Sequence, residues 1–445
     1  MEQFASSMSF SVFRKAKDLK KRILFTLAAL IICRLGTYVP LPGINPGVIA
    51  EFLKQNSVGI MGFLDMFSGG AVGRMTMFSL GIIPYISASI IMQLMTSVFP
   101  YFEALKKEGE IGRKKIGLYT RYATIMMATV QAFGVAAGLE HLSGQAGPAV
   151  TIPGWFFRLM TVLTLTGSTM FLVWVGDQIT SRGIGNGTSM IIYAGIVANL
   201  PSAIFKTFEL GRQETFSLFI LFLILAGVIG VIYYVVFMER AQRRIPVQYP
   251  KRQVSVNMPA VAQNTHLPLK LNSAGVIPPI FASSLLLFPA TIIAFVNVAE
   301  DSWLRYFTNF FAHDQLPYII CFIGLIIFFT FFYTALMFNP EETAENLRKS
   351  GSYIPGVRPG KQTADFIDYM LTRLTTVGAL YLASVCVIPE FIVMKMSLPF
   401  YLGGTSILIV VSVTIDTISQ VQSHLMVHQY EGLIRKSKMG KKGKF

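Results

Sequence analysis

Apolar and polar positions along this chain are grouped into long blocks rather than alternating residue by residue. About ten apolar blocks approach the roughly 20 residues that a helix needs to cross a bilayer. Backbone groups in hydrocarbon must be hydrogen-bonded within their own segment, so each block is predicted to be a helix. The fifth block is the weakest, because Gly195, Asn199 and Pro201 interrupt it. The blocks are residues 23–42, 76–99, 118–138, 155–176, 188–205, 216–238, 274–296, 317–338, 371–394 and 399–421.

Composition supports the same fold class. Apolar residues occupy 53% of the 445 positions and charged residues only 14%, whereas soluble domains carry about 25% charge. Buried helices of a soluble protein would be fewer and shorter, so we predict an all-α polytopic membrane protein with about ten transmembrane helices. Cys33, Cys321 and Cys386 lie inside apolar blocks without CxxC spacing, which argues against disulfides and a zinc site.

The formal charge of +15 is unevenly placed. Most of the 38 basic residues lie before the first block, in alternate loops and after the last block. The positive-inside rule therefore places these loops and both termini in the cytoplasm. No small-x-small site follows the first block, so we do not expect a cleavable signal. The lysine-rich tail from Arg435 to Lys444 is interpreted as a solvated end that touches anionic lipid.

Residues 60–75 form a shorter apolar segment that is broken at Gly69 and Gly70. The segment is too short to cross a bilayer, and lipid cannot satisfy the ends of a half-helix. We therefore predict a half-helix that is buried in protein or lines a cavity. An amphipathic helix on the outer leaflet is the alternative, and it is the weaker one because no hydrophilic linker precedes the next block.

Few side chains within the blocks can carry chemistry. Gln93, Gln131 and Asn272 lie in blocks or at their ends, where amides usually face another helix or water. The main ionisable groups within blocks are Arg34, Asp177 and Asp416. Ion-coupled transport needs a chain of such groups near the middle of the membrane, so this scarcity argues against it.

No pattern typical of an enzyme is present. Gly183–Gly187 resembles a nucleotide-binding loop only superficially, since no strand precedes it. His424 and His428 have the i, i+4 spacing of a metal pair but lack an acidic partner. Asn186-Gly187-Thr188 matches a glycosylation sequon, but at a predicted cytoplasmic end. We expect no catalytic activity, no metal site and no cofactor.

Two of the basic loops carry signals of local structure. Loop 239–273 has basic clusters on either side of the alternating stretch Ile245 to Tyr249, which predicts a hairpin or ordered arm. In loop 339–370, prolines and glycines surround Arg358 and stiffen its presentation. Orientation alone would not need stiff arms, so docking of a large anionic partner is favoured over charge that only sets topology or binds lipid head groups.

Seven segments, in order along nearly the whole chain, are similar to bacterial SecY, and the chain resembles a member of that family. These segments are Asp65-MFSGGA-Val72, Gly81-IIPYISASIIMQLM-Thr96, Lys106-KEGEIGRKKIGLYTRY-Ala123, Gly183-IGNGTS-Met190, Asn272-SAGVIPPIFASS-Leu285, Pro355-GVRPGKQTA-Asp365 and Tyr401-LGGTSILIVVSVTID-Thr417. The resemblance implies two pseudo-symmetric five-helix halves around a central pore, residues 1–210 and 211–445, hinged between spans five and six. It also implies conduction of unfolded secretory polypeptides and lateral release of membrane-protein helices.

The resemblance assigns a role to particular residues. A plug around 62–74 would close the external funnel, with Asp65, Met66, Phe67, Ser68, Gly69, Gly70 and Arg74. The constriction would be a pore ring of Ile82, Ile86, Thr188, Ile192, Ile280 and Ile409. Spans two and three against seven and eight would form a lateral gate, with Gln93, Gln131, Asn272, Ser283 and Ser284 near its seam. The two arms would dock a motor or ribosome through Arg243, Arg244, Lys251, Arg252 and Arg358.

Partners and location also follow from the resemblance. The implied partners are the SecE and SecG subunits, the SecA motor ATPase, the ribosome, SecD/SecF, YidC, secretory polypeptides with signal sequences, and anionic lipids. The implied location is the plasma (inner) membrane of a bacterium. The sequence departs from the family at Thr188, where an aliphatic residue is common, and at Val254 to Asn264, which lacks a second basic tip.

Two classes of function remain from the residues themselves. One is a passive polypeptide conduit, and the other is a secondary transporter of a small solute built on inverted repeats. A conduit needs an apolar constriction without fixed affinity, whereas a transporter needs a polar site at broken helices. Isoleucines at the constriction favour the conduit.

Overall fold

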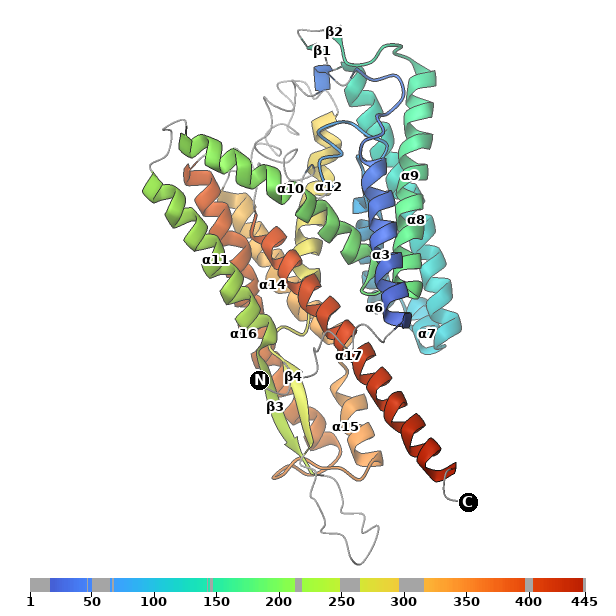
Figure 1. The fold of residues 1–445 in the computed structure, drawn as a ribbon, viewed down its shortest axis with the longest axis vertical. Helices are drawn as coiled ribbons and strands as arrows, with labels where there is room; N and C mark the ends of the chain where they lie inside the picture. The colour runs from blue at the N-terminus through green and yellow to red at the C-terminus, as the bar shows by residue number, and fades with distance from the viewer. Residues whose placement is uncertain are drawn as a thin grey trace, which may run out of the picture.

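The computed structural model describes residues 17–45, 47–49, 65, 68–141, 143–144, 147–212, 218–248, 265–295, 316–396 and 403–442. Within these residues the chain is almost entirely helical (Figure 1). The helices are α3 (Lys17–Gly36), α6 (Ile83–Val98), α7 (Pro100–Lys107), α8 (Glu110–His141), α9 (Trp155–Arg182), α10 (Gly187–Arg212), α11 (Leu218–Arg240), α12 (Ile277–Phe295), α14 (Leu316–Met337), α15 (Pro340–Lys349), α16 (Lys361–Met396) and α17 (Gly404–Lys442). The strands are β1 (Ser143–Gly144), β2 (Gly147–Pro148), β3 (Gln242–Val247) and β4 (Thr265–Lys270).

Each of the ten predicted apolar blocks coincides with a helix. In the described residues, five stretches are long and apolar enough to cross a membrane by length and hydropathy: Glu110–Glu140, Trp155–Arg182, Pro317–Lys349, Lys361–Pro389 and Gly404–Met426. A sixth is added if α6 and α7, which meet at a bend of 95°, count as one span. The predicted class, an all-α polytopic membrane protein, is confirmed.

The first helix ends earlier than predicted, and the second begins later than predicted. The first helix ends at Gly36 instead of continuing to residue 42, and α6 begins at Ile83 instead of residue 76. The residues released from both blocks pair with each other, through a bridge between Pro40 and Thr76. This long-range pairing satisfies backbone groups that a helix would otherwise have used.

The predicted half-helix around residues 62–74 is wrong for residues 68–74, whereas Asp65 is helical. Residues 68–74 form consecutive turns. Gly69 and Gly70 have φ angles of +70° and +85°, which a right-handed helix does not tolerate. Residues 50–64, 66 and 67 lie outside the described residues.

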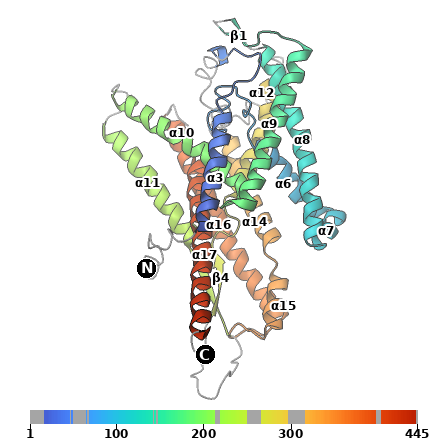
Figure 2. The same cartoon turned by 45° about the vertical axis from the view of Figure 1, so that its right-hand side comes forward.

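The helices pack into one body in which α12 occupies a central place. It contacts α6 and α8 on one side and α14 on the other, while α8 also packs on α9. The helix α17 contacts α3, α10, α11 and α16, so it joins early and late parts of the chain. Figure 2 shows the same arrangement turned about the vertical axis, with α17 extending toward one end of the molecule. Many large apolar side chains of α8, α9 and α11 are exposed, as expected for lipid-facing surfaces.

Glycines allow close helix contacts at the start of α10. A Cβ on Gly187 would lie 1.9 Å from the carbonyl oxygen of Gly176 in α9. Small residues at such contacts let helix backbones approach, and packing of this kind stabilises helices in lipid. The contact therefore requires glycine at position 187.

We expect Gly187→Ala to lower stability, because the added methyl must push α9 and α10 apart. Overpacking of this kind costs about 1–3 kcal/mol. The midpoint of thermal unfolding in detergent, followed by loss of the monodisperse peak, measures the effect. Gly167→Ala, also in α9, is the control, because nothing lies within 4 Å of a Cβ there. Equal midpoints for the two variants would contradict the prediction.

The two basic loops form one arm. As predicted, loop 239–273 contains an antiparallel hairpin in which β3 pairs with β4, from Gln242 opposite Lys270 to Val247 opposite Thr265. Loop 339–370 joins it, because Gln248 and Tyr353 exchange backbone hydrogen bonds of 2.9 and 3.1 Å. A shared apolar cluster lies beneath both, and its buried members are Ile245, Val247, Leu269, Ile354, Ile367 and Leu371. The arm lies at the end of the molecule opposite β1 and β2, at the level of α15 (Figure 1).

Candidate functional site

Five isoleucines from four separate helices or their ends lie buried in the interior. Ile82 precedes α6 and Ile86 lies in its first turn, Ile192 is in α10, Ile280 in α12 and Ile409 in α17. All five belong to one buried apolar cluster, and their exposed fractions lie between 1% and 8%. Such side chains offer no oxygen that could replace the hydration shell of an ion. The cluster is therefore buried and apolar, without a polar side chain from these five positions.

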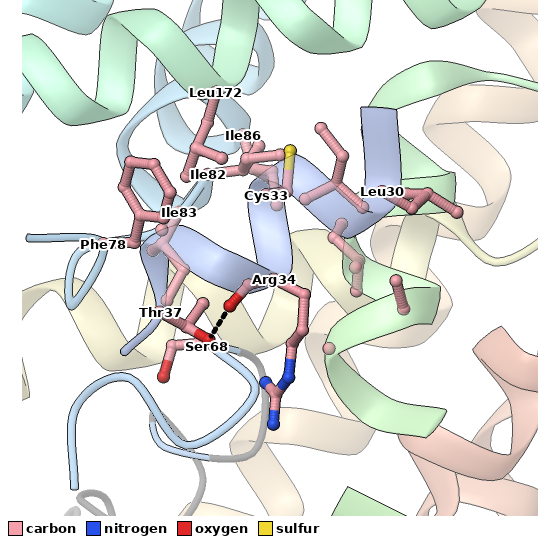
Figure 3. A pocket seen from close by; sticks show the side chains of 15 residues that line it. Leu30, Cys33, Arg34, Thr37, Ser68, Phe78, Ile82, Ile83, Ile86 and Leu172 are labelled. Carbon is pink, nitrogen blue, oxygen red and sulfur yellow. Dashed lines mark hydrogen bonds between the residues drawn. The ribbon is translucent and has the colours of Figure 1, made fainter. Parts of the chain in front are cut away.

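A cavity of about 60 Å³ adjoins three of these isoleucines, Ile82, Ile86 and Ile192. Phe78 and Leu172 continue its apolar wall, as Figure 3 shows. Its polar lining comes from Arg34, Thr37 and Ser68. The cavity thus lies between the isoleucine cluster and the turn segment that begins at Ser68.

The turn segment is held together by its own hydrogen bonds. The Asp65 carboxylate accepts from the N–H of Gly73 at 2.5 Å, and the Asp65 carbonyl accepts from the N–H of Gly70 at 2.8 Å. The Ser68 hydroxyl donates to the same carbonyl and accepts from the N–H of Val72, both at 3.1 Å. These bonds give a compact unit despite its two left-handed glycines.

Thr188 stands at the start of α10, where its hydroxyl donates to Asn186 Oδ1 at 2.8 Å. The backbone N–H of Thr188 donates to the same oxygen at 3.2 Å. Its methyl group lies beside Gly176 of α9. The side chain is half-buried, and its polar atom takes part in ending the 183–187 loop. Thr188 is not a member of the buried apolar cluster to which the five isoleucines belong.

The seam between α12 and the pair α6 and α8 is closed and contains buried polar groups. Gln131, Ser283 and Ser284 are all buried. The Ser283 hydroxyl donates to the Ile280 carbonyl of its own helix at 3.0 Å. Within the described residues, Gln93 Oε1 is buried without a hydrogen-bond partner. A buried oxygen without a hydrogen bond costs free energy. Separation of the helices at this contact would let water reach the oxygen, which removes that cost without breaking a hydrogen bond.

Asn272 lies at the base of the arm, between β4 and α12. Its Nδ2 donates to Glu239 Oε1 at 2.7 Å and to the Gly275 carbonyl at 3.1 Å. The Tyr381 hydroxyl of α16 approaches the same Glu239 oxygen at 3.5 Å. This amide therefore ties the segment just before α12 to the end of α11.

The arm exposes the predicted basic residues that the structure describes. Arg243 and Arg244 lie on β3, and Arg358 lies in the turn between α15 and α16; all three are exposed. Gly356 and Gly360, with φ angles of +83° and +110°, shape that turn. Four predicted site residues lie outside the described residues: Met66, Phe67, Lys251 and Arg252.

Sequence reasoning noted Arg34 as an ionisable group within a span but gave it no task. In the structure its guanidinium donates to the carbonyl of Gly69. The signal available in the sequence was that Arg34 is an isolated charge within an apolar block. The acceptor is a backbone atom 35 residues away in the chain, and no pattern in the sequence could name it.

The fold and site define a polytopic helical membrane protein whose helices enclose a buried apolar cluster. The family model described as SecY matches residues 76–418. The chain is 50% identical to the protein translocase subunit SecY of Rickettsia conorii, over 96% of this chain and 98% of the relative. The same subunit of Escherichia coli K12 is also 50% identical, over 96% and 97%. The chain belongs to the SecY family and is a channel subunit rather than an enzyme.

Solved structures show the same fold. A structure described as that of a protein conducting channel matches with a TM-score of 0.65 at 18% identity, over 91% of this chain and 92% of the other. A SecY structure described by its plug domain matches with a TM-score of 0.63 at 18% identity over the same shares. Sec61 in a canine ribosome-channel complex matches with a TM-score of 0.62 at 17% identity, also over 91% and 92%.

Proposed function

We propose that this chain is the central channel subunit of a protein translocase, through which unfolded secretory polypeptides cross the plasma membrane of a bacterium. The observation that carries the proposal is that five isoleucines from four helices or their ends belong to one buried apolar cluster. Branched apolar side chains can surround many different passing sequences without binding one of them. A solute transporter would instead need fixed polar groups at this place.

In this proposal, the two halves of the chain, residues 1–210 and 211–445, both contribute side chains to the constriction. The first half supplies Ile82, Ile86 and Ile192 with Thr188 at the rim, and the second supplies Ile280 and Ile409. The segment 62–74 acts as the plug, a role supported by the position of Ser68 at the cavity below the isoleucines. A relative is described as having a plug domain that stabilises the closed state of the channel.

The lateral gate lies between α6 and α8 on one side and α12 and α14 on the other. Its closed seam is supported by the contacts of α12 with α6 and α8. Gln93, Gln131, Ser283 and Ser284 lie on these helices, and Asn272 fixes where α12 begins. A signal helix entering the seam would replace these contacts and favour the open state, which is a shift of populations.

The arm is the docking surface for a motor or a ribosome, through Arg243, Arg244, Lys251, Arg252 and Arg358. The joined hairpin and turn support this role, because they present cations on a rigid base. Sec61, a structural relative, is described in a ribosome-channel complex. SecE, SecG, SecA, SecD/SecF and YidC are the further partners proposed from family membership, with both termini of the chain in the cytoplasm.

Capture of a translocating chain tests the conduit directly. We expect a photocrosslinking amino acid at Ile86 to capture a stalled secretory polypeptide, because Ile86 lies in the constriction. The control position is Met126 of α8, which is 72% exposed and faces lipid. The yield at position 86 should exceed the yield at 126 severalfold. Equal yields would mean that the chain does not pass the isoleucine cluster.

A further inference from the structure

Arg34 carries a positive charge near the end of α3, where the helix approaches the turn segment 68–76. A charge in a membrane helix is costly unless it faces protein or water and finds a partner. Arg34 is half-buried and lines the cavity (Figure 3). Its Nη1 donates to the carbonyl of Gly69. A hydrogen bond from a charged donor is roughly twice as strong as a neutral one.

The acceptor is held in place from two sides. A Cβ on Gly69 would lie 2.7 Å from Arg34 Nη1 and 3.0 Å from the Cα of Gly195 in α10. The backbone of Gly69 is therefore wedged between the guanidinium and another helix. The φ angle of +70° at this residue turns its carbonyl toward Arg34, and glycine adopts that angle without strain.

Tyr38 extends this contact to the rest of the segment. Its ring lies 5.4 Å from the Arg34 guanidinium and 4.3 Å from that of Arg74, which belongs to the segment itself. Cations at these distances are attracted to an aromatic face. The Tyr38 ring thereby links Arg34, near the end of α3, to Arg74 of the turn segment.

The two ends of segment 68–76 are fastened differently in the described residues. At its C-terminal end, backbone hydrogen bonds join Leu41 to Met75 at 3.1 Å and Met77 to Val39 at 3.0 Å. At its N-terminal end, the connection to α3 is the side-chain bond from Arg34. The C-terminal end is thus a fixed attachment, and the N-terminal end is a releasable one.

We propose that Arg34 is the latch of the channel, a positioning residue that holds the plug under the constriction until the Gly69 carbonyl is released. This inference rests on the proposed role of segment 62–74 as the plug. Opening then requires the guanidinium to exchange the carbonyl for water, while the attachment at Met75 and Met77 keeps the segment tethered. Cys33, which is buried and lines the same cavity, becomes accessible when the latch opens.

The test uses the complete channel with its partner subunits in lipid vesicles and planar bilayers. Arg34→Gln removes the charge and the forked donor, and Arg34→Lys keeps the charge alone. We expect Arg34→Gln to raise the resting open fraction about tenfold or more, the shift produced by losing a charge-assisted bond. Reaction of native Cys33 with a water-soluble maleimide, read by mass spectrometry, should rise in parallel, and Arg34→Lys should fall between.

Two controls separate the latch from other causes. Arg373 lies 4.3 Å from the ring of Tyr369 in α16, so Arg373→Gln removes a comparable arginine–tyrosine contact away from the plug and should leave both readouts unchanged. If Arg34→Gln does not insert, Gly69→Ala replaces it, because its methyl displaces the guanidinium at an unfavourable φ. That variant is expected to act in the same direction.

A further variant distinguishes failure of the latch from failure of the proposed function. Ile409→Asn is measured beside Arg34→Gln as a test of the constriction itself. If Ile409→Asn raises conductance and stably inserted Arg34→Gln changes neither conductance nor Cys33 labelling, the latch is overturned and the pore stands. If Ile409→Asn also has no effect, the constriction is wrong. Parallel increases in both variants support latch and pore together.

Discussion

Replacing Ile409 by Asn is expected to make the resting channel leak ions and to relax its demand for a functional signal sequence. Ile409 is 1% exposed within the isoleucine cluster. An amide buried there without a partner costs about 1–3 kcal/mol. In a wider, hydrated state, water can hydrogen-bond to the amide and this cost is lowered. The substitution therefore destabilises the closed state relative to the hydrated state.

Conductance in planar bilayers and export of a substrate with a defective signal measure the two effects. Resting conductance should increase by about an order of magnitude, the population shift that corresponds to 1.4 kcal/mol. Ile409→Leu conserves volume and apolar character and should behave as the parent chain does. A stably inserted Ile409→Asn channel that stays tight and stringent would remove this residue from the constriction.

Reversing the charge at Arg358 is expected to impair partner-driven export without harming the folded channel. The side chain is exposed, and surface ion pairs contribute only about 0–1 kcal/mol to stability. The turn beneath it stays in place, because the Thr363 hydroxyl bonds to the Arg358 carbonyl at 2.8 Å and not to the guanidinium. At a desolvated docking contact, by contrast, losing a charged partner costs about 2–5 kcal/mol.

Binding of the motor or ribosome to the purified channel should therefore weaken about thirtyfold or more in Arg358→Glu. Lys349→Glu is the matched control, since it makes the same charge change at an exposed residue on α15 of the same arm. An equal loss in both variants would show that only the net charge of the arm matters. Unchanged export by Arg358→Glu would exclude this arginine from docking.

In the proposed channel, the seam and the isoleucine cluster both keep the closed state shut. The cluster does so through apolar side chains, whereas the turn segment contacts α3 and α10 through Gly69. Buried seam groups such as Gln93 Oε1 and Ser87 Oγ have no hydrogen-bond partner within the described residues. Separation of the seam can therefore hydrate them, which lowers the cost of opening on that side.

The sequence by itself determined that the apolar blocks are helices, that the protein is a membrane protein, and where the two basic loops lie along the chain. Long apolar blocks are a local property, and a bilayer leaves helices as the only solution for them. The alternating stretch at Ile245 likewise determined a strand, because its period of two is read within a few neighbouring residues. The assignment of the isoleucines to a constriction required the family resemblance, since isoleucine is common in every span.

Only the tertiary structure decided which distant groups meet. Residues 37–42 and 76–82 of the first two apolar blocks are not helical, and the bridge between Pro40 and Thr76 uses the backbone of both. The bond from Asn272 to Glu239, the union of the two arms at Gln248 and Tyr353, and the bond from Arg34 to Gly69 joined residues far apart in the chain. Local patterns specify how a segment hydrogen-bonds to itself, whereas the choice of a distant partner depends on three-dimensional packing.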